Sequence, residues 1–155
     1  MKIRPYQPKD QEAVQKLHWA GLDQFNARMD GPDIDQDLEN IEQIYINNNG
    51  DFIVGLIDDR VVSMAAFRKM TETVAEIKRI RVDQPFQKKG LGQQILSALE
   101  KSAEEKGYRK LRLDTTSSQQ PAQKLFERNG YQVTGRKLWN DLEIIFYEKD
   151  ISPIM

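Results

Sequence analysis

The hydrophobic period of the chain changes from helical to extended near Gly50, and this change constrains the fold more than any other feature. Before it, apolar residues recur every three or four positions, which predicts a helix from Asp10 and a second helix over residues 35–46. The stretch "MKIRPY" predicts a strand ahead of them. After Gly50, "DFIVGLI", "VVSMAAF" and "TVAEIKRIRV" alternate as strands, and the "DDR" between the first two predicts a hairpin.

The second half of the chain alternates helices with strands. An apolar stripe at helical spacing (Leu91, Ile95, Leu99 and Ala103) predicts a helix that Gly107 ends, and "LRLD" predicts a short strand after it. "PAQKLFERNG" predicts a further helix, and "YQVTGRKLW" with "LEIIFYEKD" predicts a closing hairpin. The order predicts one α/β domain over residues 1–155, with a mixed sheet of about seven strands, about four helices and a right-handed strand–helix–strand crossover.

The charge balance and the lack of cysteine exclude several classes of function. The sequence holds 23 Lys and Arg against 24 Asp and Glu, which gives no overall signal for nucleic-acid binding. Without cysteine there is no disulfide framework, no thiolate zinc site and no cysteine nucleophile. The N-terminus lacks the apolar run of a signal peptide, and no stretch approaches the ~20 apolar residues of a membrane span. We expect a cytoplasmic protein with neither a membrane nor a nucleic-acid partner.

The segment "QKKGLGQQIL", residues 87–96, places two lysines and two glycines in front of a helix. A helix N-terminus carries unpaired N–H groups and a partial positive charge, and glycine lets a phosphate approach the backbone closely. The segment does not fit a Walker loop, and Ile95 stands where the dinucleotide fingerprint needs its third glycine. One glycine could simply form a turn, but the position after a strand favours a site for a phosphate-bearing cofactor.

Two motifs carry a family resemblance. "QKKGLG" after "EIKRIRVDQPF" resembles the first motif of the GNAT family, the GCN5-related N-acetyltransferases, and "QQPAQKLFERNGY" is similar to its second motif. The resemblance spans nearly the whole chain and is strongest from Glu76 to Tyr131. It implies a GNAT-like fold, a twisted mixed sheet that splays between its fourth and fifth strands, with acetyl-CoA in the gap.

The resemblance also implies cofactor-binding residues. The backbone of Ile80, Arg81 and Val82 would pair with the pantetheine arm, as an added strand does. Gln120 falls where the family often directs an Asn or Gln at the same arm, and Phe126 occupies the position of the family's usual tyrosine. The pyrophosphate would lie on the backbone amides of Gln87, Lys88, Lys89, Gly90, Leu91, Gly92 and Gln93.

The activity that the resemblance implies is transfer of an acetyl group from acetyl-CoA to a primary amine of a small molecule or peptide. Without cysteine, direct attack in a ternary complex is favoured, with the oxyanion held by a backbone N–H near residues 80–82. Glu76, six residues before Val82 and expected on the same face of the strand, is the candidate base. Alternatively, Glu76 faces solvent or pairs with an arginine. Phe126 has no proton to give to the departing thiolate. Water or Tyr131 would then serve as the general acid, or the reaction would use none. Alternatively, Tyr131 packs under the sheet. The rival function is a non-catalytic acyl-CoA-binding regulatory module.

The remaining signals concern the acceptor, metals and assembly. His18 is expected to be a packed or half-exposed histidine. Residues 33–39 begin like a calcium loop, but Leu38 and Ile44 stand where its glycine and glutamate are required, so we expect no metal and a solvated, helix-capping run. An acidic rim there would favour a cationic amine. Trp19, Phe25 and Met29 would line the acceptor pocket or belong to the core, and the apolar "LEIIFYE" strand favours a homodimer.

Overall fold

A seven-stranded mixed sheet with the order β1-β2-β3-β4-β5-β7-β6 forms the centre of the protein. The computed structural model describes residues 1–24 and 36–152. All strand pairs are antiparallel except the parallel pair of β4 and β5. The strands are β1 (Lys2–Pro5), β2 (Asp51–Ile57), β3 (Arg60–Lys69), β4 (Val74–Val82), β5 (Lys110–Thr116), β6 (Gln132–Trp139) and β7 (Leu142–Asp150).

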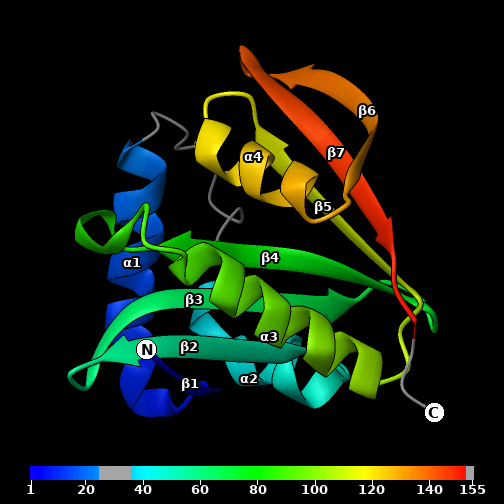
Figure 1. The fold of residues 1–155 in the computed structure, drawn as a ribbon. Coiled ribbons are helices and arrows are strands. Elements are labelled where there is room, and N and C mark those ends of the chain that lie inside the picture. The colour runs from blue at the N-terminus through cyan, green and yellow to red at the C-terminus, as the bar shows by residue number, and fades with distance from the viewer. Residues whose placement is uncertain (25–35, 153–155) are drawn as a thin grey trace.

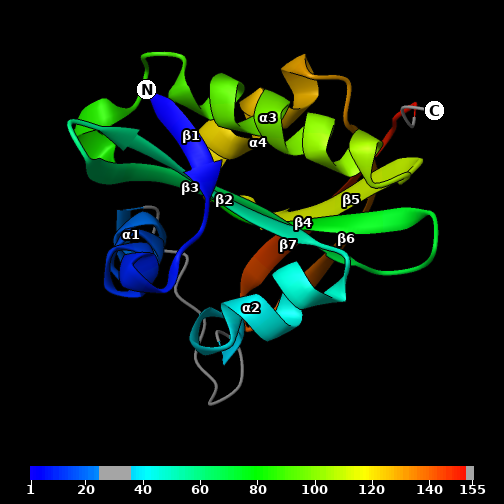
Figure 2. The same ribbon diagram turned by 90° about the horizontal axis from the view of Figure 1, so that it is seen from below.

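Helices cover both faces of the sheet, as Figures 1 and 2 show. The helices α3 (Leu91–Glu105) and α4 (Gln120–Arg128) lie on one face, and α1 (Gln11–Gln24) and α2 (Ile41–Ile44) lie on the other. Each face has its own apolar core. The α3/α4 core includes Ile77, Leu99 and Leu113, whereas the α1/α2 core includes Leu17 and Met64. The predicted fold class, a mixed sheet of about seven strands flanked by about four helices, is confirmed.

The parallel strands β4 and β5 pair only at their beginnings. Their register runs from Val74↔Lys110 to Glu76↔Arg112 and then ends. Figure 1 shows the two strands separating beyond that point, so the predicted splay between the fourth and fifth strands is confirmed. Beyond that point the facing edges of β4 and β5 are not paired with each other.

A β-bulge in β4 lies beside the splay. Ala66 pairs with Lys78 and Met64 pairs with Arg81, so two residues of β4 stand opposite one of β3. Arg79, inside the bulge, has a φ of 59°. The extra residue reverses the alternation of side chains, so the expectation that Glu76 and Val82 share a face is wrong. Val82 approaches Gly92 of α3, while Glu76 lies on the opposite face.

The helix predicted over residues 35–46 is broken into short pieces. A 3-10 turn (Gln36–Glu39) precedes α2 (Ile41–Ile44), and another (Ile46–Asn48) follows it. Asn40 between the first two has φ −135°, ψ 42°, which is not helical. Burial of Leu38, Ile41 and Tyr45 against the sheet outweighs the continuous helical pattern. The expected pocket residues Phe25 and Met29 lie outside the described residues.

Candidate active site

A cavity of about 130 Å³ lies in the splay between β4 and β5. Residues 77–81 of β4 and 113–116 of β5 form its sides. His18 and Leu22 of α1 close it on one face, while Ala122 and Phe126 of α4 and the preceding Gln119 close it on the other. In open α/β sheets, ligands bind where strands separate at their carboxyl ends. Of the residues predicted to bind the cofactor, this cavity brings Ile80, Arg81 and Phe126 together.

The start of α3 has room for an anion. Gly90 is the N-cap with a φ of 83°, and a Cβ atom built on it meets nothing within 4 Å. Lys88 and Lys89 beside it are exposed. Open space at Gly90, two nearby cations and the partnerless N–H groups of a helix start together suit a phosphate. Gly92 is packed, because a Cβ there would lie 3.4 Å from Leu125.

The side chains of Gln87 and Gln93 bond within the protein. Gln87 Nε2 donates to the Val82 carbonyl at 2.8 Å and to Gln24 Oε1 at 3.0 Å, which ties the loop to β4 and α1. The amide of Gln93 exchanges two hydrogen bonds of 2.8 Å with the amide of Asn129. Leu91 is buried. These three residues would therefore contact a cofactor through their backbone atoms.

The amide side chain in the cavity wall belongs to Gln119, one position before the predicted Gln120. Gln119 is buried, and its Oε1 accepts from Arg81 Nη1 at 3.2 Å while its Nε2 donates to Thr116 Oγ1 at 3.1 Å. Gln120 is exposed at the first position of α4. Because Gln119 and Gln120 are consecutive, the sequence alone cannot show which of them lines the cavity.

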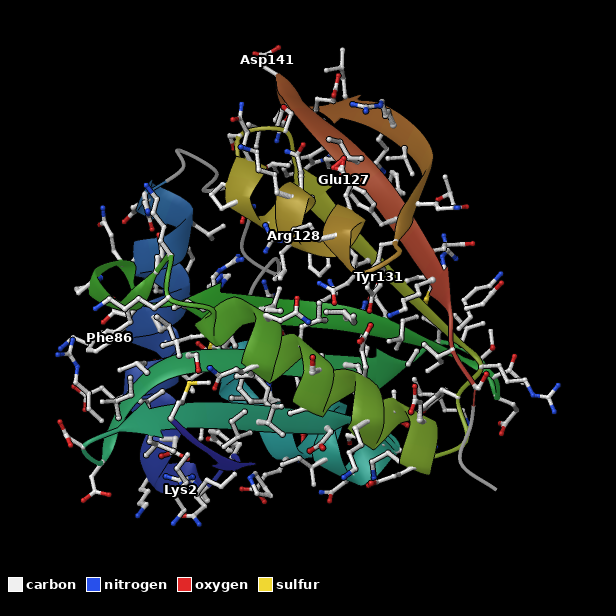
Figure 3. All side chains as sticks on the ribbon, in the orientation of Figure 1. Lys2, Phe86, Glu127, Arg128, Tyr131 and Asp141 are labelled. Carbon is white, nitrogen blue, oxygen red and sulfur yellow. The ribbon has the colours of Figure 1, made fainter. Side chains whose placement is uncertain are left out.

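Phe126 and Tyr131 form an aromatic pair, with ring centroids 5.3 Å apart. Phe126 faces the cavity, so no phenol stands at that position. Tyr131 follows the last turn of α4 (Figure 3), and its hydroxyl donates to Glu100 Oε2 at 2.8 Å. Burial raises the pKa of the Tyr131 phenol, and the charge of Glu100 raises it further. Tyr131 packs in the α3/α4 core under the sheet and does not line the cavity.

Glu76 has an arginine partner, one of the alternatives open from the sequence. Its Oε1 accepts from Arg68 Nε at 2.9 Å and lies 3.9 Å from Lys78 Nζ. It lines a separate hollow with Ile44 and Asn48 rather than the cavity in the splay. Its predicted role as base stays a prediction.

Asp114 of β5 is a cavity carboxylate that the sequence analysis missed. It lies on the α1/α2 face, because its neighbour Leu113 points into the α3/α4 core. Burial raises the pKa of this carboxyl and the charge of Glu76 adds to the rise, although Lys78 opposes it. The signal in the sequence was the aspartate that ends "LRLD", a polar residue at the carboxyl end of a strand beside the splay.

A buried ion pair anchors the bulge of β4. Asp37 accepts from Arg79 Nε at 2.9 Å and from Arg79 Nη2 at 2.5 Å, and the Tyr45 hydroxyl donates to the same carboxylate. Burial would raise the pKa of Asp37, but the hydrogen bonds and charge of Arg79 outweigh it and hold that pKa below its usual value. The expectation that residues 33–39 are solvated is wrong for Asp37, which is buried.

The other expected features of the site are simpler to place. His18 is fully buried in the cavity wall, and Trp19 beside it is partly buried. Within residues 1–24 and 36–152, no three His, Cys, Asp or Glu side chains gather as metal ligands would. None of the helices in that part of the chain is long and apolar enough to cross a membrane.

Comparison with known proteins gives one family match and several relatives. The model of the "Acetyltransferase (GNAT) family" matches residues 13–131. An uncharacterised N-acetyltransferase of Bacillus subtilis, YsnE, is 34% identical over 76 residues, 48% of this chain and 50% of that protein. N-acetylaspartate synthetase of Xenopus tropicalis is 31% identical over 101 residues, 64% of this chain and 37% of that protein. The matches thus span half or less of these relatives' lengths.

Solved structures match the fold along most of the chain. A GNAT-family acetyltransferase of Staphylococcus aureus has a TM-score of 0.88 at 22% identity, covering 96% of this chain and 98% of its own. The Salmonella typhimurium protein yncA, solved with acetyl-CoA, has a TM-score of 0.77 at 22% identity, with coverages of 100% and 96%. An aminoglycoside 6'-N-acetyltransferase, solved with coenzyme A, has a TM-score of 0.76 at 16% identity, with coverages of 100% and 99%.

Proposed function

Since the chain belongs to the acetyltransferase (GNAT) family, we propose that it transfers an acetyl group from acetyl-CoA to a primary amine of a small molecule or peptide. The observation that carries the proposal is the pairing of two sites, the cavity in the splay and the open helix N-terminus at Gly90. One suits the thioester end of the cofactor and the other suits its pyrophosphate. Relatives with this fold have been solved with acetyl-CoA and with coenzyme A.

In the proposed complex, the cofactor reaches the splay from the face of α3. The pyrophosphate lies on the amides of residues 87–93, near Lys88 and Lys89. The pantetheine arm follows the β4 backbone at residues 80–82, on the side where pairing with β5 has already ended. Arg81 contributes through its backbone, because its side chain packs on α1 at Gly21 and donates to Gln119.

The acceptor reaches the thioester from the α1/α2 face. Its amine attacks the carbonyl carbon, and a β4 backbone N–H beside the bulge stabilises the tetrahedral oxyanion. The C–S bond then breaks and coenzyme A leaves. Because Phe126 in the cavity wall has no hydroxyl, it cannot protonate the leaving sulfur. The sulfur instead takes the proton that the attacking nitrogen releases.

The experiment is an acceptor screen with acetyl-CoA. Released thiol would be followed with a panel of primary amines that contains 1,4-diaminobutane, tyramine, lysine, aspartate and peptides with a free α-amine, and products would be weighed by mass spectrometry. We expect an amine-dependent release of thiol and an acetylated product. Binding of coenzyme A without acetylation of any amine would favour the rival function, a non-catalytic acyl-CoA-binding module.

A homodimer through the closing hairpin remains part of the proposal. The β6 strand is a sheet edge, and Leu138 on it is 77% exposed. An apolar side chain on an open edge strand favours pairing with another chain. Sedimentation equilibrium of wild type and Leu138→Lys would test it, with dimer expected for the first and monomer for the second. A wild-type monomer at all concentrations would contradict it.

A further inference from the structure

Asp114 and Lys78 stand on the two sides of the opening between β4 and β5. The last paired residues of these strands are Glu76 and Arg112, and Lys78 and Asp114 are the next residues of each strand on the same face. Both line the cavity, but no ion pair joins them because the strands have separated. Asp114 therefore lies at the mouth of the cavity on the α1/α2 face, opposite the face on which α3 begins.

Among the described residues, no hydrogen bond or ion pair involves the side chain of Asp114, although its backbone pairs with Phe146 of β7. The neighbouring carboxylates differ in this respect. Glu76 accepts from Arg68, Asp37 accepts from Arg79, and Glu148 Oε1 lies 3.0 Å from Arg112 Nε. Asp114 lines the cavity but is exposed, so its carboxylate stays accessible at the cavity mouth without a partner among the described residues. Asp114 is thus the carboxylate of this region that remains available to a ligand cation.

The surroundings of Asp114 favour a proton acceptor. Burial raises its pKa and the charge of Glu76 raises it too, whereas Lys78, Lys137 and Arg68 lower it. His18 of α1, with Arg79 and Arg81 of β4, also faces the cavity. A carboxylate with a raised pKa holds an abstracted proton better than an ordinary aspartate does.

We propose that Asp114 binds the ammonium group of the acceptor and is the catalytic base of the acetyl transfer. The inference rests on the proposed function. Asp114 takes one proton from the ammonium, and the freed amine forms a C–N bond with the thioester carbon. The C–S bond breaks, and the second nitrogen proton goes to the departing sulfur. Asp114 then releases its proton to water. The acceptor class is accordingly a primary amine that is protonated in solution.

The proposal gives Glu76 a different role from the one expected from the sequence. Glu76 holds Arg68 and lies beside Lys78, so it balances two cations that would otherwise lower the basicity of Asp114. It is a positioning residue that acts through Asp114. Its removal would shift the acidic limb of the pH–rate profile to lower pH, whereas removal of Asp114 would abolish that limb.

The first test compares kinetics at saturating acetyl-CoA with the best amine of the acceptor screen. Asp114→Asn should lower kcat by roughly 10²- to 10⁴-fold with coenzyme A affinity within about twofold of wild type. Higher pH should partly restore its rate, because more amine then arrives deprotonated. Asp59→Asn, the same change in the exposed β2–β3 turn, should behave as wild type. Wild-type turnover by Asp114→Asn across the pH range would overturn the proposal.

The second test needs no acceptor and uses coenzyme A as the probe. The side-chain carboxyl ¹³C signal of Asp114, assigned with Asp114→Asn, would be titrated with and without saturating coenzyme A. The proposal expects the cofactor to raise the titration midpoint, because its thiol end excludes water from the splay beside the carboxylate. An unchanged midpoint in the saturated protein would place Asp114 away from the thioester and overturn the proposal. Failure to bind coenzyme A would instead contradict the proposed function.

Discussion

The guanidinium of Arg79 and the carboxylate of Asp37 form a buried ion pair that fixes the bulge of β4 to the turn before α2. Their closest atoms, Nη2 and Oδ1, are 2.5 Å apart, and 42 residues separate the two in sequence. Arg79 has a left-handed φ, a conformation that costs a non-glycine residue about 1–3 kcal/mol and persists only where its surroundings impose it. The pair thereby holds the backbone beside which the thioester is expected to react.

Removal of the Asp37 charge should therefore destabilise the fold. We expect Asp37→Asn to lower the free energy of unfolding by about 1–3 kcal/mol, because the charge-assisted hydrogen bonds to Arg79 lose the carboxylate charge. Urea denaturation would measure it. Asp58→Asn, in an exposed turn, is the matched control and should stay within about 0.5 kcal/mol of wild type. Equal stability of the mutant and wild type at neutral pH would contradict the role given to the pair.

The same pair should make stability depend on pH. Because the folded pKa of Asp37 is depressed, its carboxylate stabilises the folded state above the unfolded pKa of about 3.9. This stabilisation is lost as pH falls through the folded pKa.

The glycine at the start of α3 is expected to matter for the cofactor rather than for the fold. Gly90→Val should weaken coenzyme A binding by more than about tenfold, the equivalent of about 1.4 kcal/mol, because the new side chain fills the space left for the pyrophosphate. Gly107 offers a matched control at the other end of α3, with a φ of 91° and equally open space. Gly107→Val should suffer the same backbone strain and keep its affinity in calorimetry. Equal affinities for the two variants would contradict the pyrophosphate site.

The two lysines before Gly90 should act through long-range charge. Lys88→Ala and Lys89→Ala should each weaken coenzyme A binding less than Gly90→Val does, because both lysines are exposed. The loss should shrink with added salt, as the screening length falls from about 10 Å at 0.1 M to about 3 Å at 1 M. Lys101→Ala, exposed on the middle of α3, is the control and should change nothing. A loss that is independent of salt would indicate direct, desolvated contacts instead.

A phenol restored in the cavity wall tests whether an acid is missing. Phe126→Tyr places a hydroxyl on a ring that already faces the cavity. We expect kcat for the best amine acceptor to hold or rise, because the new group can donate a proton to the departing sulfur. Thermal unfolding would verify that the buried ring still packs on Tyr131. A lower kcat in a protein of unchanged stability would show that no acid is needed at that position.

The sequence predicted the elements and their order well, because hydrophobic period and glycine positions are local signals. Apolar stripes at helical spacing located α3 and α4, and alternation located the strands on either side of Gly50. The broken helix near Asn40 was missed, since its ends depend on what Leu38 and Tyr45 pack against rather than on the local pattern.

The side-chain arrangement of the site was only partly predictable, because it depends on strand register and on contacts between distant residues. The bulge at Arg79 adds one residue to a strand, and this reverses every side chain after it without any mark in the alternation. The partner of Asp37 lies 42 residues away, and the pairing of Glu76 with Arg68 depends on the register of β3 and β4. Asp114 became a candidate only when the splay showed that it has no partner among the described residues.

A crystal structure of this protein with acetyl-CoA would test the proposed cofactor site directly. We expect the pyrophosphate on the backbone amides of residues 87–93 and the pantetheine arm along residues 80–82 of β4. We expect the acetyl group in the splay, with the carboxylate of Asp114 on the acceptor side. A cofactor bound outside the splay, or a pyrophosphate away from the start of α3, would contradict the proposed site.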